Sequence, residues 1–292
     1  MKLSATSPSG PGIPAKLHTS SKIVDVNEGN ASITLQNGTI VQGDIVIGSD
    51  GVHSITRSKI GPEVKPFGSG KSAFRFLISR QVALDDPVTS KFVQKSGELI
   101  IWYDRDRRVV MYPTSDNQIL NFVCIHPEAL SETGNDTWNS QGNIERLLDI
   151  YRGFDPALLC LLKKVNVSDI KVWKLLDMDV LPTWVKGRLA LLGDAAHPFL
   201  PHQGQGGGVA IEDAASLAVV LERSTPKEEI TVRLELYEKI RINRANRIQE
   251  LSRIAGKDLN ENIKLDSKPS DFQVFSDAES YSARQHKLQF RS

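Results

Sequence analysis

The residues with the clearest chemical potential lie between Gly193 and Asp213. A short apolar run, residues 189–192, leads into Gly193-Asp194, and a loop and an expected helix follow. An aspartate at the end of a buried strand can accept hydrogen bonds from sugar hydroxyls. A helix N-terminus suits a ligand atom that gains negative charge. A long flexible loop before a helix would show the same pattern, so the residues alone leave both interpretations open.

The loop within this segment is rich in glycine. Because glycine has no Cβ atom, backbone N–H groups in such a loop can approach a ligand closely. The residues concerned are Gly204, Gly206, Gly207 and Gly208.

A second candidate site follows another apolar run, residues 44–48 (DIVIG). This run ends at Asp50-Gly51, and a polar turn leads on to Arg57. A simple turn explains an Asp-Gly pair taken singly. Two buried strands that both end in a Gly/Asp pair are harder to dismiss, so we treat residues 48–57 as a second ligand-contacting loop.

Other potential sites are weaker. His197 and His202 have no third ligand arranged nearby, so we expect structural or cofactor-adjacent histidines and no metal. Cys124 and Cys160 lack a sequence neighbour that would make them nucleophiles, and two cysteines are too few for a disulfide scaffold. Residues 10–15 fit a loose G-x-G-x-x-A pattern, but they follow no strand and contain two prolines, so we reject them as a dinucleotide fingerprint.

The elements that must position these loops follow from periodicity. Two short alternating runs, residues 23–26 and 33–35, predict a hairpin, and Asn37-Gly38 predicts a second turn. Both DIVIG and RLALL (residues 188–192) are apolar at consecutive positions, which predicts strands buried on both faces. Residues 209–221 have apolar residues at helical spacing.

The middle of the chain has a different texture. Four β-rich runs between residues 70 and 125 predict an antiparallel sheet: SAFRFLIS, ELIIWYD, RRVVMYPT and QILNFVCI. Residues 143–165 show a helical face that Gly153 and Pro156 interrupt. Residues 227–254 predict a charged helix in which acidic and basic residues interleave, so we interpret it as solvated, with i,i+4 ion pairs.

Composition limits the class of protein. The 292 residues carry 36 Lys and Arg against 35 Asp and Glu, a net charge of +1, which gives no overall field to attract nucleic acid or an anionic membrane. No apolar run is long enough to span a membrane, and the first twenty residues lack the apolar stretch of a signal peptide. We therefore expect a soluble cytoplasmic α/β protein, with no nucleic-acid or membrane partner.

Taken together, DIVIGSDGVHSITR and GRLALLGDAAHPFLPHQGQGGGVAIEDAASLA resemble two flavin motifs of class A flavoprotein monooxygenases. This is the group around para-hydroxybenzoate and salicylate hydroxylases, and the residue sequence of the two motifs is similar to that of a fungal salicylate hydroxylase-like branch. The resemblance covers roughly residues 17–256. It implies FAD as cofactor, NADH or NADPH as co-substrate, and a small aromatic substrate and O2 as reaction partners.

The resemblance also assigns cofactor-binding residues. Gly193-Asp194 matches the pair whose aspartate binds the ribityl chain of FAD. Pro201 and the backbone of the loop Gly204, Gln205, Gly206 and Gly207 match the segment against the isoalloxazine ring. Asp50 and Gly51, in the motif that ends at Arg57, match the pair near the pyrophosphate that serves both FAD and NAD(P)H. Ser49 stands where alanine is usual in the family.

One part of the family pattern is missing from this sequence. Family members begin with a β-α-β unit that carries G-x-G-x-x-G, an acidic residue about twenty positions on, and then an arginine. None of these is present, so we expect roughly a hundred or more N-terminal residues to be lacking, as in a truncated gene model or a degenerate paralogue.

The expected fold is therefore α/β, a Rossmann-like FAD/NAD(P)-binding module, truncated at its N-terminus, with an inserted β-sheet substrate domain. The module occupies residues 1–69 and 170–256. The substrate domain occupies residues 70–169, and residues 257–292 form a polar tail that we expect to be disordered.

The implied function is hydroxylation of an aromatic, phenolic compound by an FAD-dependent monooxygenase. A non-catalytic remnant that acts as a binding or interaction module is the alternative, and a relative that oxidises a non-aromatic natural product is another. No catalytic base can be named. Arg75, Tyr103 and Tyr112 lie on the predicted sheet, where they face the substrate, the core or the solvent.

Overall fold

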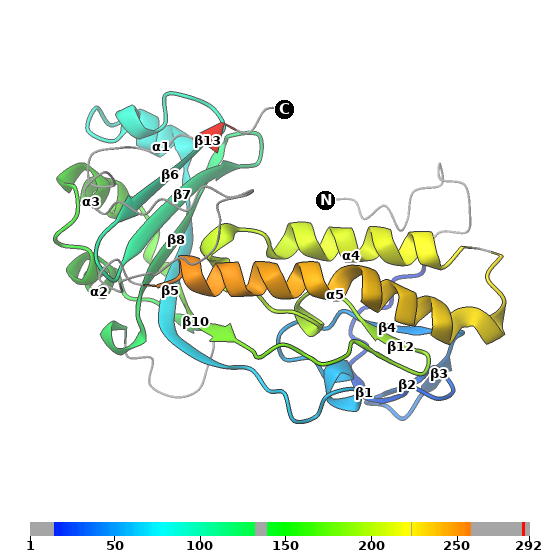
Figure 1. The fold of residues 1–292 in the computed structure, drawn as a ribbon. Helices are drawn as coiled ribbons and strands as arrows, with labels where there is room; N and C mark the ends of the chain where they lie inside the picture. Colours follow the sequence, from blue (N-terminus) through cyan, green and yellow to red (C-terminus); the bar gives the residue numbers. More distant parts are fainter. Residues whose placement is uncertain (1–14, 132–138, 223, 258–287, 290–292) are drawn as a thin grey trace. The chain divides into compact units, whose positions relative to one another are not determined.

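The computed structural model describes residues 15–131, 139–222, 224–257 and 288–289 (Figure 1). The chain divides into two compact units, and it passes between them more than once. The first unit comprises Met1–Pro66, Met178–Phe199 and Gly204–Gln249. The second unit comprises Phe67–Asp177, Leu200–Gln203 and Glu250–Ser292.

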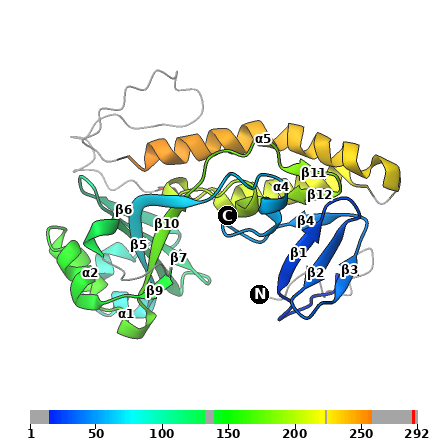
Figure 2. The same cartoon turned by 90° about the horizontal axis from the view of Figure 1, so that it is seen from below.

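The first unit begins with a small antiparallel sheet. Its order is β1-β2-β3, and its strands are β1 (Ile23–Asn27), β2 (Ser32–Leu35) and β3 (Ile40–Gln42) (Figure 2). Gly38 adopts a φ of +83° in the turn before β3, a conformation that favours glycine. The predicted hairpin and the second turn at Asn37-Gly38 are confirmed.

A second three-stranded sheet lies in the same unit, with the order β11-β12-β4. β4 (Val46–Gly48) and β12 (Leu189–Leu191) run parallel, and β11 (Val185–Lys186) pairs antiparallel with β12. All three residues of β12 are buried, as predicted. In β4, Val46 and Ile47 are only half-buried, in contrast to the prediction, because β4 is the edge strand of this described sheet and has a strand partner on one side.

Two long helices complete the first unit: α4 (Gly206–Val220) and α5 (Ile230–Ala255), whose residues to Gln249 belong here. Figure 1 shows them side by side. One face of α5 packs in the core through Leu234, Tyr237, Ala245 and Ile248. The prediction of a solvated helix is therefore wrong for this face, although Arg233 and Glu229 do form an i,i+4 pair at 3.1 Å.

The second unit is built on a seven-stranded sheet of order β13-β6-β7-β8-β5-β10-β9. Its strands are β5 (Phe67–Ser79), β6 (Glu98–Tyr103), β7 (Arg108–Thr114), β8 (Ile119–Pro127), β9 (Asn139–Gln141), β10 (Lys171–Asp177) and β13 (Leu288–Gln289). Every pairing is antiparallel, which confirms the prediction for the four β-rich runs. β10 was not predicted, and it pairs with β5 although its residues were assigned to the piece 170–256.

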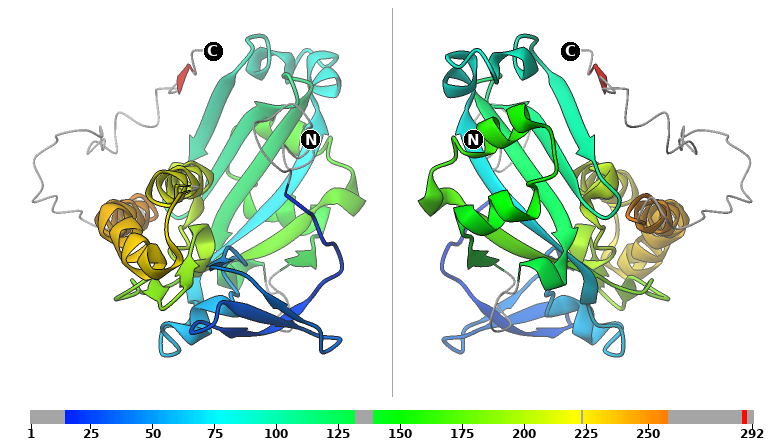
Figure 3. Two further views of the ribbon diagram at one scale, coloured as in Figure 1. Left: turned by 90° about the vertical axis from the view of Figure 1, so that its right-hand side faces the viewer. Right: turned by 90° about the vertical axis from the view of Figure 1, so that its left-hand side faces the viewer.

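One face of this sheet carries the main core of the second unit. Phe74, Phe76 and Phe122 pack there with the buried residues of α2 (Ile144–Ile150) and α3 (Pro156–Leu162). Figure 3 shows these helices over the sheet, while α1 (Arg80–Leu84) follows directly from β5. The interruption predicted at Gly153 and Pro156 is confirmed, and Asp155 caps α3 by accepting the Ala157 N–H at 2.8 Å.

No helix within the described ranges is both long and apolar enough to cross a membrane. The polar tail and the rejected glycine pattern at residues 10–15 fall almost wholly outside the described residues.

Candidate functional site

The two predicted loops follow neighbouring parallel strands. In the ladder between β12 and β4, Leu191 is opposite Gly48, so both strands end at the same edge of the sheet. The carboxyl ends of parallel strands are where α/β proteins hold ligands. The structure thus brings residues 48–57 and the turn after β12 together, although 143 positions separate Gly51 from Asp194 in the chain.

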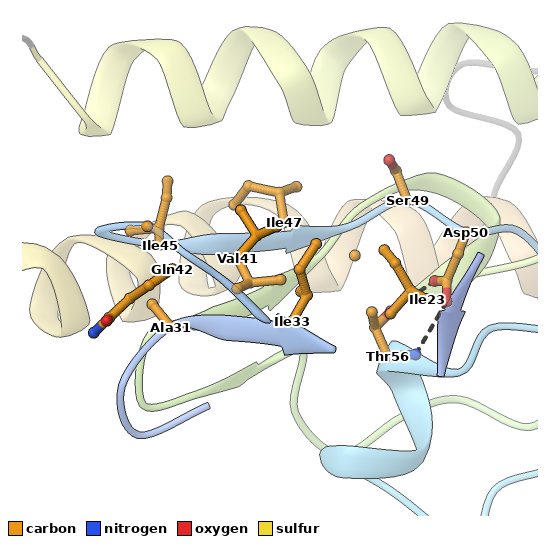
Figure 4. A pocket seen from close by; sticks show the side chains of 13 residues that line it. Ile23, Ala31, Ile33, Val41, Gln42, Ile45, Ile47, Ser49, Asp50 and Thr56 are labelled. Atoms are coloured by element: carbon orange, nitrogen blue, oxygen red, sulfur yellow. Dashed lines mark hydrogen bonds between the residues drawn. The ribbon is translucent and has the colours of Figure 1, made fainter. Parts of the chain in front are cut away.

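The Asp50 carboxylate is used inside its own loop. Oδ1 accepts hydrogen bonds from the Ser54 and Thr56 hydroxyls, both at 2.6 Å. Oδ2 accepts the N–H group of Ile55 at 2.7 Å. It also accepts the N–H group of Thr56 at 3.0 Å, and Figure 4 shows Asp50 beside Thr56. Burial raises the pKa of Asp50, but these bonds outweigh it and hold the pKa below its usual value. The side chain therefore shapes the loop, and what the loop presents to a ligand is backbone at Gly51.

Glycine is present at two positions of this region for different structural reasons. A Cβ atom on Gly48 would lie 2.1 Å from the Thr56 hydroxyl oxygen, so the loop can close against the strand only because residue 48 is glycine. Gly51 has a φ of +80°, and a Cβ there would meet nothing within 4 Å. Open space at Gly51 means that packing inside the protein does not demand a glycine there.

Arg57 ties this loop to the turn after β12. The residue lies within a short 3-10 helix, η2 (Thr56–Lys59), and is 3% exposed. Its Nη1 donates to the carbonyl oxygens of Ala195 at 3.1 Å and Asp194 at 3.4 Å. Its Nη2 donates to the carbonyl of Val52. Since its donors are directed at backbone carbonyls, Arg57 holds the two loops together and does not extend toward solvent.

Asp194 differs from Asp50 in having its carboxylate unengaged. It lies in η6 (Gly193–Ala195), directly after β12, and is exposed. Its carboxylate accepts no hydrogen bond from any residue that the structure describes. Desolvation by the surrounding protein raises the pKa of Asp194 above its usual value, and His197 opposes this rise. An exposed carboxylate at a strand end is available to ligand hydroxyl groups.

The glycine-rich loop ends at the start of α4. Gly204 has a φ of +64°, and Gln205 is the N-cap residue but makes no side-chain capping bond. A Cβ on Gly204 or Gly207 would meet nothing within 4 Å, and one on Gly206 only a carbon of Phe199 at 3.9 Å. The first N–H groups of α4 are therefore uncapped by side chains and unobstructed, which suits an electron-rich ligand edge.

Pro201 completes the set of residues that sequence analysis assigned to the cofactor. It is the first residue of η7 (Pro201–Gln203), which belongs to the second unit. The structure thus brings the other assigned residues together within the first unit and describes Pro201 with the second.

A hollow of about 400 Å³ lies beside the loop of residues 48–57 (Figure 4). Its apolar lining comes from the small sheet and from β4, including Ile23, Ile33 and Ile47, and Ser49 and Asp50 line its polar part. The volume is within the range of small-molecule sites.

Sequence reasoning missed a buried charged network under the Asp194 turn. Asp213, which is 0% exposed on α4, accepts hydrogen bonds from His197 at 2.6 Å and from Arg241 at 2.9 Å. The helical spacing of apolar residues in α4 does not indicate a buried carboxylate at Asp213, and Arg241 lies in the helix interpreted as solvated. His197 is buried and its Nε2 bonds to Asp213, so the imidazole belongs to this network. Within the described ranges no group of side chains could hold a metal ion.

These features suit the part of FAD that consists of the ribityl chain and the flavin ring. An unengaged carboxylate and an unobstructed, uncapped helix start are the groups that a polyhydroxyl chain and an electron-rich ring edge require. Among the described α-helices, α4 alone starts with glycine residues, so a second α-helix start of this kind for a pyrophosphate is not found in the described part of the chain.

Comparison with known proteins agrees with this geometry. Residues 17–252 match the family described as "FAD binding domain". The chain is 36% identical over 259 residues to the FAD-dependent monooxygenase phomE' of Diaporthe leptostromiformis, covering 86% of this chain and 64% of that protein. It is 30% identical over 254 residues to hispidin-3-hydroxylase of Neonothopanus nambi, covering 82% of this chain and 60% of that enzyme.

Among solved structures, a salicylate hydroxylase in complex with its substrate superposes with a TM-score of 0.71 at 28% identity. The match covers 85% of this chain and 62% of that one. The chain therefore spans less than two thirds of the length of each of these relatives.

Proposed function

This chain belongs to the family of FAD-dependent monooxygenases, and we propose that its first unit binds FAD at the ends of β4 and β12. The observation that carries the proposal is the Asp194 carboxylate at the end of a parallel strand, which is exposed and accepts no hydrogen bond from the described residues. Its neighbour Gly193 leads into the same turn that Arg57 holds in place.

Each part of the site has a role in this proposal. Asp194 accepts hydrogen bonds from ribityl hydroxyls, because a carboxylate is an acceptor at both oxygens. The N–H groups of Gly204 to Gly207 and the positive end of α4 stabilise negative charge at the edge of the ring system. When bound, FAD supplies the electron-transfer and oxygen-activating chemistry of the family, with NADH or NADPH as the reductant.

The second unit would supply the substrate surface. On the sheet face opposite to its phenylalanine core, the Arg75 guanidinium lies 4.6 Å from the centroid of the Trp173 ring, and the Asn121 amide donates to the Tyr112 hydroxyl at 2.7 Å. Aromatic rings beside a cation and hydroxyl groups suit a phenolic compound. We therefore propose an aromatic, phenolic substrate, which is hydroxylated with O2.

Tyr103, the third residue singled out in the sequence, lies at the end of β6. The Arg108 guanidinium lies 5.6 Å from the centroid of its ring, and burial raises the pKa of its hydroxyl.

A second candidate function is a flavin-binding module without catalysis. The observation that favours it is the absence, from the described residues, of a second glycine-initiated helix to grip the pyrophosphate. Such a module would bind flavin weakly and would not turn over NAD(P)H.

One purification and one assay separate the two candidates. The purified chain is examined for visible flavin absorption, and NADH or NADPH oxidation is followed in air with and without a panel of phenols. Flavin absorption together with phenol-dependent oxidation and a hydroxylated product supports the monooxygenase. Flavin binding without oxidation supports the module, and failure to bind added FAD at any concentration rejects both. A matched panel of non-aromatic alkenes tests the phenol assignment.

A further inference from the structure

A buried carboxylate lies directly beneath the turn that carries Asp194. Asp213 projects from α4, and its Oδ2 accepts two hydrogen bonds from that turn, from the Gly193 N–H at 3.1 Å and from Nε2 of His197 at 2.6 Å. Its Oδ1 accepts a third bond from Nε of Arg241 on α5 at 2.9 Å. One oxygen thus faces the turn, and the other faces the neighbouring helix.

The network around Asp213 keeps this buried group ionised. Burial raises the pKa of Asp213, but the hydrogen bonds from His197, Arg241 and the Gly193 N–H outweigh burial and lower the pKa below its usual value. Arg241 is 5% exposed and is shared with Glu212, at 2.8 Å from Nη1, and Glu212 in turn pairs with Arg244 at 2.8 Å. A buried carboxylate held in this way is expensive to disturb, because the loss of one partner leaves a charge unpaired.

The backbone of the turn is also constrained by hydrogen bonds within the turn and by Arg57. The Gly193 carbonyl accepts the N–H groups of Ala196 at 2.8 Å and His197 at 2.9 Å, while its own N–H goes to Asp213. Gly193 has a φ of +61°, and a Cβ there would lie 3.2 Å from Cβ of Ala210 on α4. Asp194 is therefore held between Gly193 on one side and Ala195, the acceptor for Arg57, on the other.

His197 supports the same interpretation. Its ring lies 4.9 Å from the rings of Trp184 and Phe199, measured between centroids, and is 1% exposed. Its Nδ1 has no hydrogen-bond partner in the described part of the chain, so Asp213 is the group that orients the imidazole by hydrogen bonding.

From this geometry we propose that Asp213 is a positioning residue for the cofactor site, one that fixes the turn so that the Asp194 carboxylate meets the ribityl hydroxyls of FAD. This inference rests on the proposed function of the site. Asp213 does not touch the cofactor, because it is fully buried behind Gly193. It acts through the Gly193 N–H and through His197.

The test compares Asp213→Asn with Glu212→Gln. Each substitution removes one negative charge. The two residues are adjacent in the chain and both contact Arg241, but only Asp213 contacts the turn. We expect Asp213→Asn to weaken FAD binding about tenfold, since the amide oxygen serves the charged Arg241 guanidinium and leaves the amide nitrogen, a donor, facing the Gly193 N–H and His197. We expect the amide hydrogen of Gly193 to exchange about tenfold faster in the absence of FAD. Glu212→Gln leaves both quantities at wild-type values.

A double-mutant cycle separates positioning from general destabilisation. In an Asp194→Ala background, Asp213→Asn has no further effect on FAD affinity if Asp213 acts through Asp194, whereas independent effects add. Additive losses, or wild-type affinity and exchange in Asp213→Asn, overturn the inference.

A second pair of variants protects the test against misfolding of Asp213→Asn. His197→Leu removes a donor to Asp213 while keeping the apolar contacts, and His197→Gln restores a donor at the position of Nε2. We expect loss of FAD affinity in the first and recovery in the second, and equal affinities contradict the inference. If the wild-type chain binds no FAD, the proposed function fails, and the exchange of the Gly193 amide still decides whether Asp213 fixes the turn.

Discussion

The guanidinium of Arg57 donates a hydrogen bond of 3.1 Å to the carbonyl oxygen of Ala195, 138 positions further along the chain. This bond joins the loop after β4 to the turn after β12. Each loop can be explained alone as a local turn, but a buried arginine between them makes them one structure. The positions of Gly51 and Asp194 relative to each other depend on it.

Replacing Arg57 with methionine should therefore destabilise the first unit. The substitution removes the donors to Val52, Asp194 and Ala195 and leaves their carbonyls without that partner, at a cost of about 2–4 kcal/mol in the free energy of unfolding. Chemical denaturation measures this cost. Arg233→Met, at an exposed i,i+4 pair, is the control and should cost less than about 0.5 kcal/mol. Equal costs for the two variants would show that Arg57 does not join the loops.

Gly207→Ala should separate stability from binding. A methyl group at residue 207 meets open space within the protein and improves helix propensity in α4, so the unfolding midpoint of the FAD-free protein stays level or rises by the equivalent of about 0.5 kcal/mol. The same methyl group occupies the space where the proposed cofactor approaches, so FAD affinity should fall about tenfold or more. Unchanged affinity would remove the start of α4 from the site. Gly153→Ala, also in open space but in the second unit, is the control and should leave affinity unchanged.

The sequence was sufficient to predict the two strands whose residues are apolar at consecutive positions. RLALL and DIVIG are both apolar at consecutive positions, and both form parallel strands at which a loop of the site begins. They differ in burial, because among the described strands β12 has neighbours on both sides and β4 has a neighbour on one side only. The sequence pattern shows how much burial a strand is suited to, but it does not show whether neighbouring strands are present to bury it.

The buried network could not be predicted in the same way. Arg241 belongs to a helix in which acidic and basic residues interleave, and on a single helix this pattern indicates solvated pairs. Its partner Asp213 is 28 positions away, in the preceding helix, and only the packing of α4 against α5 brings the two together. Likewise β10 was missed, because its pairing with β5 joins segments about a hundred residues apart.

The Asp50 loop should give a pH-dependent contribution to stability. The pKa of Asp50 is lower in the folded chain than its usual value, so its contribution is complete above about pH 5, where the unfolded-state carboxyl is ionised, and is lost as the pH falls through the folded pKa. Asp50→Ala should cost about 1–2 kcal/mol at pH 7, the cost of losing a cap on two N–H groups. Denaturant titrations of both proteins should converge on acidification below about pH 4. A constant gap between them at all pH values would contradict this account of the loop.

In the described part of the chain β4 has a strand neighbour on one side only, and this predicts the effect of fusing a β-α-β unit to the chain. Val46 and Ile47 are half-buried, and apolar residues line the hollow beside them. A fused unit that adds a parallel strand there, together with a glycine-rich helix start for the pyrophosphate, should strengthen FAD binding at least a hundredfold, through two or three N–H bonds and the helix dipole. It should also raise the melting temperature. Calorimetry on both proteins checks this, and equal affinities would mean that other residues of this chain already grip the pyrophosphate.

Calorimetric titration of FAD into the wild-type chain and into Asp194→Ala tests the central claim most directly. The account predicts saturable binding to the wild type and a loss of about ten- to hundredfold in the variant, the cost of a charge-assisted hydrogen bond to a ribityl hydroxyl. It also predicts an unchanged melting temperature without FAD, because the Asp194 carboxylate bonds to no described residue. Equal affinity of the two proteins for FAD would contradict the claim that Asp194 holds the cofactor.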